Sequence, residues 1–258
     1  SQTLHGYEKN NLYLFLRSRF GAEDAFRLMK DYRVGTSKLW PGSCVFWQTD
    51  IDGNVRTGKV MLYDAETGRR VKEPFNHVTW VHSLLRLPDF TLRQCFFGEH
   101  LLPMNRGKPV AIVESEKTAL VAAYYLPEYV WLASGGKNGC FNSDALHVLR
   151  GRQVILYPDI GATDQWQQKL SLLHNLGIEA SIFNYLEEVA TDNERTAGLD
   201  IADYLLQIEP DQAVLQTMIR KNPMLQKLID DLQLTLVSVE RSDPDTDAIN
   251  KTSTPPKQ

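Results

Sequence analysis

The fold is decided by the stretch Val110-Ala111-Ile112-Val113-Glu114-Ser115-Glu116-Lys117-Thr118-Ala119-Leu120, an apolar run that ends in a carboxylate and enters a helix-like segment. A short run of apolar residues with no polar interruption is typical of a strand buried on both faces of a sheet. Glu114 then lies at the carboxyl edge of that sheet, where it can reach a divalent cation. The alternative is that Glu114 only caps a surface helix.

The same alternation continues on both sides of this stretch. We predict strands and helices in turn, at Val110–Val113, Glu116–Tyr125, Tyr129–Ala133, Asp144–Leu149, Val154–Tyr157, Asp164–Leu176 and Glu179–Phe183. Alternating strands and helices indicate an α/β domain, a mostly parallel sheet flanked by helices. A further helical region is expected at Asp211–Leu232, with a strand-like segment at Leu234–Val239 after it.

The first 108 residues have a different texture. Leu12, Leu14 and Phe15 have helical spacing, as do Phe26 to Met29. Strand-like runs joined by turns follow, and they predict a small antiparallel meander. We therefore expect a small α+β subdomain at 1–108, the α/β domain with its helical extension at 109–240, and a disordered tail at 241–258, which is rich in Asp, Ser, Thr, Pro and Lys.

Charge separates the two halves. Residues 1–108 hold 16 Lys and Arg against 11 Asp and Glu, a charge of +5, and the remainder holds 12 against 21, a charge of −9. A basic lobe beside an acidic one suits a protein that holds phosphates with the first and metal ions with the second, although two solvated faces would look the same.

Several classes of protein are excluded or disfavoured. The longest apolar runs are strand-sized, so we expect no membrane span, and with no secretory signal visible the cytoplasm is the default location. The cysteines Cys44, Cys95 and Cys140 are odd in number and form no CxxC pair. We predict buried thiols rather than disulfides or a zinc site in this segment.

A second carboxylate follows the third predicted strand. Asp159 is expected at the same sheet edge as Glu114, and hard oxygen ligands from two strand ends suit Mg²⁺ or Mn²⁺. Asp164, one turn further on, is a third candidate ligand, or else a helix cap. Between them, Gly135-Gly136-Lys137 forms a glycine-rich turn that could approach a phosphate, or that is glycine-rich for conformational reasons alone.

The order of strand, Glu114, helix, strand, Gly135-Gly136, strand and Asp159 resembles the TOPRIM domain shared by primases, topoisomerases and related nucleases. The segment from Glu114 to Leu120 is similar to the Glu-Gly-Glu-Lys-type element of mobile-element and phage primases. Asp200-Ile201-Ala202-Asp203-Tyr204-Leu205 resembles the Asp-x-x-Asp-Tyr-Leu element that follows the metal-binding acids in those proteins. The resemblance implies divalent-metal phosphoryl transfer by Glu114 and Asp159, with Lys117 and Lys137 as electrostatic helpers and Asp200 and Asp203 as additional acids.

One departure weakens the catalytic reading. Where the family has Asp-x-Asp, this chain has Asp159-Ile160-Gly161, so the second acid is missing unless Asp164 replaces it. The N-terminal half resembles the β-rich subdomain that precedes TOPRIM in bacterial primases, where basic residues approach phosphates. Its candidates here are Arg56, Lys59, Arg69 and Arg70, each of which could equally serve solubility. Trp40, Trp47 and Trp80 could stack on bases or pack in the core.

Three functions follow as hypotheses. The leading one is a DNA primase-like catalytic core that uses Mg²⁺ or Mn²⁺, nucleotides and a single-stranded DNA template for primer synthesis in mobile-element or plasmid replication. The resemblance also implies a helicase or a zinc-binding module as partner. The alternatives are a metal-dependent nuclease with the same acids, and a nucleic-acid-binding accessory module that has lost catalysis.

Overall fold

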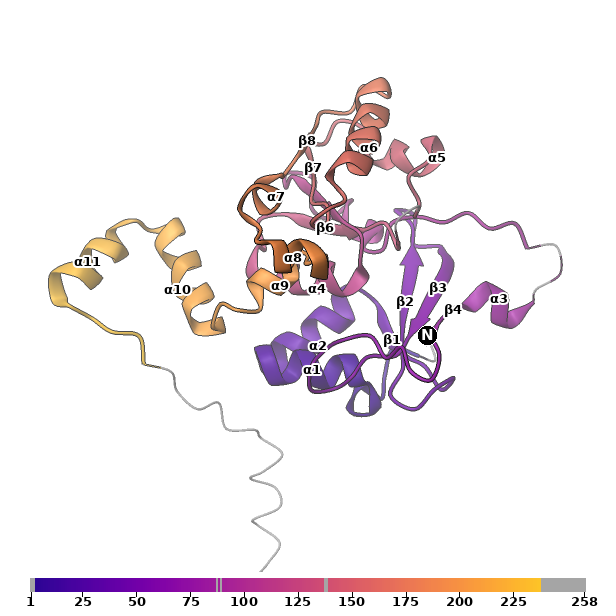
Figure 1. Cartoon of the computed structure of the whole chain (residues 1–258), viewed down its shortest axis with the longest axis horizontal. Coiled ribbons are helices and arrows are strands. Elements are labelled where there is room, and N and C mark those ends of the chain that lie inside the picture. Colours follow the sequence, from indigo (N-terminus) through magenta and orange to yellow (C-terminus); the bar gives the residue numbers. More distant parts are fainter. Residues whose placement is uncertain (1–2, 87, 89, 137–138, 238–258) are drawn as a thin grey trace, which may run out of the picture.

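The computed structural model describes residues 3–86, 88, 90–136 and 139–237. It contains two four-stranded sheets, one antiparallel and one parallel, joined through a shared core (Figure 1). No helix in the described part of the chain is long and apolar enough to cross a bilayer. The predicted α/β class with a helix-flanked parallel sheet is confirmed.

The N-terminal half begins with two helices and continues as a meander. Asn10 caps the first helix, because its side chain accepts hydrogen bonds from the Leu12 and Tyr13 amides, a cap that contributes about 1 kcal/mol. Gly21, with φ of 84°, separates the first helix from the second. The antiparallel sheet has the order β1-β2-β3-β4, as the turn pattern predicts. The elements are η1 (Tyr7–Lys9), α1 (Asn11–Phe20), α2 (Ala22–Asp31), β1 (Val34–Thr36), β2 (Cys44–Thr49), β3 (Val55–Met61), β4 (Val78–Trp80), α3 (Val81–Leu85) and η2 (Glu99–Leu101).

The second sheet is parallel throughout, with the order β6-β5-β7-β8. All four residues of β5 are buried, and they alternate between two clusters: Ala111 and Val113 pack on one face, Val110 and Ile112 on the other. The elements are β5 (Val110–Val113), α4 (Glu116–Tyr125), β6 (Val130–Ala133), α5 (Ser143–Leu146), η3 (His147–Leu149), β7 (Val154–Leu156), α6 (Thr163–Asn175) and β8 (Ala180–Ile182). The strands and helices predicted between residues 110 and 183 are all present, with ends that differ by a few residues.

One hydrophobic core runs through both halves. It joins Phe15, Phe20 and Phe46 of the first half to Ala119 and Trp131 of the second. The Tyr32 hydroxyl donates to the Trp131 carbonyl at 3.1 Å, and Phe97 forms a β-bridge with Ala133. The three cysteines are free and buried, as predicted. This packing holds the antiparallel sheet against the carboxyl edge of the parallel one.

The C-terminal part contains helices that the periodicity did not predict: α7 (Tyr185–Val189), α8 (Asp192–Ala197) and α9 (Ile201–Leu205). The expected helical region is two helices, α10 (Pro210–Lys221) and α11 (Met224–Leu232), separated at Asn222 and Pro223. None of the residues in these two helices is buried, and both helices lie away from the sheets (Figure 1).

The strand expected at Leu234–Val239 is wrong for residues 234–237, which have no regular structure. No described strand lies beside this segment to pair with it, and a strand forms only where a neighbour supplies hydrogen bonds. Residues 238–239 and the predicted disordered tail at 241–258 lie outside the described residues.

Candidate active site

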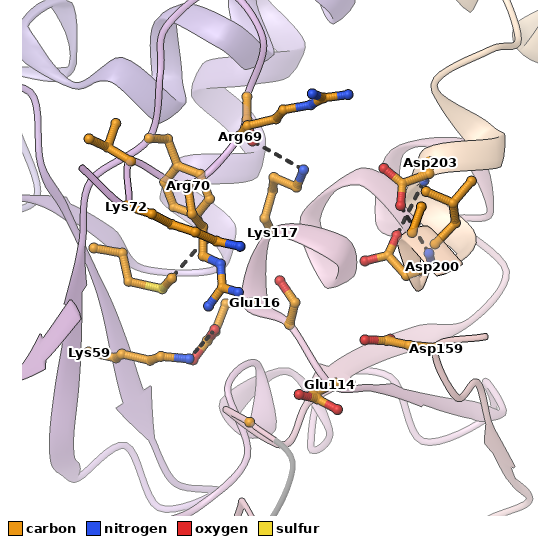
Figure 2. Close-up of a pocket in the computed structure, with 18 of the residues that line it drawn as sticks. Lys59, Arg69, Arg70, Lys72, Glu114, Glu116, Lys117, Asp159, Asp200 and Asp203 are labelled. Carbon is orange, nitrogen blue, oxygen red and sulfur yellow. Dashed lines mark hydrogen bonds and ion pairs between the residues drawn. The ribbon is translucent and has the colours of Figure 1, made fainter. Parts of the chain in front are cut away.

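Two strand ends bring Glu114 and Asp159 to one edge of the sheet. β5 and β7 are parallel neighbours, with Val110 opposite Val154 and Ile112 opposite Leu156. Glu114 follows β5 and Asp159 follows β7, and both side chains line one cavity of about 810 Å³ (Figure 2). Burial, together with the charges of nearby carboxylates that include Glu114, raises the pKa of Asp159 to about 8.

Asp200 and Asp203 line the same cavity from the start of α9. They form a capping box: Asp200 Oδ1 accepts from the Ala202 and Asp203 amides, and Asp203 Oδ2 accepts from the Asp200 amide at 2.9 Å. The other Asp200 carboxylate oxygen accepts from the buried Thr118 hydroxyl on α4. Burial and the charge of Asp203 raise the pKa of Asp200. The capping role considered from the sequence is therefore present, and it does not remove either acid from the cavity.

The opposite wall of the cavity is basic. Lys59, Arg69, Arg70 and Lys117 are there, as is Lys72, which the sequence reasoning missed although it belongs to the same short basic run (Figure 2). Lys117 Nζ donates to the Gly68 carbonyl at 3.2 Å, which ties α4 to the basic loop of the first half. Acidic side chains of the second half thus face, across this cavity, basic side chains that come mainly from the first half.

A buried ion pair joins the two walls. Lys59 Nζ lies 3.1 Å from Glu116 Oε2 and donates to the Gly135 carbonyl at 3.0 Å. Glu116 belongs to the motif segment but was not a predicted site residue, and its side chain is 1% exposed. Gly135 and Gly136 have φ of 81° and 139°, which favour glycine. Gly136 lines the cavity.

Lys169 on α6 is a second residue that the sequence reasoning missed. Its ammonium is buried, forms no hydrogen bond, and lies 3.9 Å from the centroid of the Trp166 ring and 4.6 Å from that of the Phe141 ring. Burial lowers its pKa, and the charges of Glu114 and Asp159 oppose that shift. The one sequence feature that could have predicted Lys169 is its position on the buried face of the helix.

Two of the predicted residues that the structure describes, Asp164 and Arg56, are not part of this arrangement. Asp164 is exposed in the first turn of α6, where Ala162 is the cap residue, and it does not line the cavity. Arg56 pairs with Asp50 at 2.5 Å and lines a separate cavity of about 590 Å³. Arg56 lies at the register shift between β2 and β3 and pairs with Asp50, whereas Lys59 pairs with Glu116 at the large cavity. Lys137 lies outside the described residues.

The carboxylates in the cavity are chemically suited to bind a hard divalent cation. Their oxygens are the ligands that Mg²⁺ and Mn²⁺ prefer, and a bound cation would oppose both the burial and the neighbouring negative charges that raise the pKa of Asp159. Within the described residues, no group of three or more His, Cys, Asp and Glu side chains is already arranged to hold a metal ion. Glu114 and Asp159 are the residues that would hold one.

Comparison with known proteins places the chain in a family. The model of the family described as "Domain of unknown function (DUF6371)" matches residues 10–160, which include both strand-end acids. The chain belongs to this family. No curated protein gives a significant match.

Solved structures show which fold the chain shares. The RNA polymerase domain of Mycobacterium tuberculosis primase DnaG is 12% identical, covers 82% of this chain and 77% of its own, and has a TM-score of 0.51. The primase fragment of the bacteriophage T7 primase-helicase protein is 16% identical over 76% of this chain and 77% of its own, with a TM-score of 0.43. The E. coli primase catalytic core is 13% identical over 74% and 66%, with a TM-score of 0.39. The chain has the fold of a primase catalytic core, as the comparison with the M. tuberculosis DnaG domain shows.

Proposed function

We propose that the chain is a DNA primase-type nucleotidyltransferase that extends primers on single-stranded DNA in mobile-element or plasmid replication, in the cytoplasm. The observation that supports it best is the cavity with Glu114 and Asp159 on one wall and five cationic side chains on the other. Acids that attract metal and bases that attract phosphate are both needed to join a nucleotide to a primer. The primase-core fold agrees with this chemistry.

Each group has a task in this reaction. A bound Mg²⁺ or Mn²⁺ would supply Lewis acidity toward the phosphate and the attacking 3′ hydroxyl. Glu114 and Asp159 would hold the cation, and Asp200 and Asp203 would add negative charge to the same cavity. Lys117, Arg69, Arg70 and Lys72 bind and orient the phosphates of the nucleotide and the template.

The test is primer synthesis on single-stranded DNA with nucleoside triphosphates and Mg²⁺ or Mn²⁺. Glu114→Ala and Asp159→Ala should each lower the yield at least a hundredfold, on the order of the loss expected when a charge-stabilising group is removed. Asp164→Ala is the matched control, because it deletes a carboxylate that lies outside the cavity, and it should leave synthesis unchanged.

Other outcomes would select another function. Nicking of DNA that depends on Glu114, without nucleotide incorporation, would identify a nuclease. DNA binding that needs no metal and survives Glu114→Ala, again without incorporation, would identify an accessory module. Either result would reject primer synthesis by this chain. The proposal includes a helicase or a zinc-binding module as a partner of this chain in primer synthesis.

A further inference from the structure

Lys169 on α6 is a buried cation without a hydrogen-bond partner. The residue is 8% exposed, and among the described residues its ammonium forms neither a hydrogen bond nor an ion pair. The ammonium contacts the faces of the Trp166 and Phe141 rings instead. Removing an ammonium from water without a counter-ion destabilises a protein. The stability of the fold therefore gives no reason for a lysine at this position.

The ammonium is directed at the carboxyl edge of the parallel sheet. Lys169 lies in the first half of α6, the helix that follows Asp159. Side chains of a helix tilt toward its N-terminus, which here lies at that edge. Phe141 lies at the same edge, because the amide of the preceding residue, Cys140, donates at 3.1 Å to the carbonyl of Ser134, the first residue after β6. The contact with both rings thus fixes the position of the ammonium.

This position is beside the acid pair, on the side of the protein interior. β5 lies between β6 and β7 in the sheet, so a group that bridges the segment after β6 and the helix after β7 lies next to the end of β5, where Glu114 is. Burial and neighbouring acids raise the pKa of Asp159, and the charge of Lys169 opposes that shift. Lys169 is not among the residues that line the large cavity. It therefore acts on the two acids through its charge.

We propose that Lys169 is a positioning residue for the metal site, because its ammonium controls how the acid pair binds a divalent cation. The positive charge lowers the affinity of Glu114 and Asp159 for a free cation, and it favours a cation that arrives with the phosphates of a nucleotide. This role rests on the proposed function, since it concerns the same metal site. It assigns a task to a residue that contacts neither metal nor substrate.

The charge has opposite effects on the two ligands. The ammonium repels a free divalent cation, and this repulsion is stronger than in water because protein surrounds the ammonium. A nucleoside triphosphate that carries one divalent cation keeps a net negative charge, so the ammonium attracts that complex. The cationic side chains on the opposite wall of the cavity add to this attraction. Lys169 therefore favours a site that metal and nucleotide fill together.

Calorimetry on the full chain measures binding of Mn²⁺ alone and of the Mn²⁺ complex of ATP. Lys169→Met keeps most of the length of the side chain and removes its charge. It should tighten binding of Mn²⁺ alone roughly tenfold and weaken binding of the complex several-fold, the scale expected for one charge at the effective dielectric constant of a protein. Lys227→Met, the same change at an exposed position on α11 outside the cavity, should alter neither affinity.

A structural role for Lys169 predicts different results. Weaker binding of both ligands by Lys169→Met, or unchanged binding of both, would overturn the proposal. Lys169→Gln, a second neutral variant, should repeat the opposite changes seen with Lys169→Met. Failure of both neutral variants to fold would make Lys169 a structural residue and would reject the proposal as well.

Failure of the proposed metal site gives another pattern. Neither wild type nor Lys169→Met would then bind Mn²⁺, or Glu114→Ala would bind it as tightly as wild type, and the role of Lys169 would be rejected together with the site. Binding of Mn²⁺ that is lost in Glu114→Ala but unchanged in Lys169→Met would reject only the role of Lys169.

Discussion

Replacing Asp159 by Asn should stabilise the protein in the absence of divalent metal while it abolishes synthesis. Asp159 is surrounded by carboxylates at the sheet edge, and the pKa of Asp159 rises from 3.8 to about 8 through burial and the charges of Asp200, Glu114 and Asp203. When the pKa of a carboxyl is higher in the folded chain than in the unfolded chain, ionisation of that carboxyl lowers the free energy of unfolding. Asn keeps the shape of the side chain and removes the charge.

The direction of the change in the free energy of unfolding follows from the raised pKa of Asp159. Below about pH 4 the carboxyl is protonated in both folded and unfolded chains, so the substitution has little effect there. Between pH 4 and pH 8 the unfolded chain ionises first, and the free energy of unfolding of wild type falls. Above pH 8 the penalty is complete. At about 1.4 kcal/mol per pKa unit the upper limit is about 6 kcal/mol, which solvent screening of this partly exposed side chain reduces to roughly 1–3 kcal/mol.

Urea denaturation in EDTA at pH 5, 7 and 9 measures this difference. The gain in free energy of unfolding for Asp159→Asn should grow with pH, and Asp164→Asn, at the exposed position on α6, should show none. Added Mg²⁺ should stabilise wild type and not Asp159→Asn, because the cation binds only the folded wild-type site. An equal gain at pH 5 and pH 9, or a loss at pH 9, would refute the account of crowded carboxylates.

Three further perturbations test separate parts of the site. Lys59→Ala leaves Glu116 buried without its ion-pair partner and should lower the free energy of unfolding by about 3 kcal/mol in urea; the double change with Glu116→Gln should recover part of this loss. Asp200→Ala removes the cap of α9 and the contact with Thr118, and should cost about 1–2 kcal/mol in thermal melts, whereas Asp200→Asn should cost less. Lys72→Ala should weaken single-stranded DNA binding and lower the salt dependence of the affinity by roughly one ion, measured by anisotropy at several salt concentrations; an unchanged slope would place Lys72 outside the phosphate path.

The strand-end acids show what a sequence can determine about a site. Glu114 and Asp159 each follow a buried apolar strand, and parallel neighbours bring their carboxyl ends to one edge whatever the remaining packing is. The apolar runs between residues 110 and 183 also predicted strands β5 to β8, because buried strands read as continuous apolar runs, whereas the periodicity missed α7, α8 and α9. The sequence pattern was sufficient for these features because each depends on residues that are close together in the chain.

Tertiary structure decided the rest. Lys72 and Lys59 reach the acids because the shared core packs the antiparallel sheet against the parallel one, and no spacing along the chain encodes that contact. The same packing buries Glu116 and Gln48 beneath the Gly135 turn, whereas the pairing of Arg56 with Asp50 stays within the β2–β3 hairpin. The sequence alone determined the fold class and the place of Glu114 and Asp159 at one sheet edge, while its third metal candidate, Asp164, lies outside the cavity. Which cations face those acids, and which polar groups are left without partners, depend on contacts between residues far apart in the chain, whose free energy appears only when both halves are folded together.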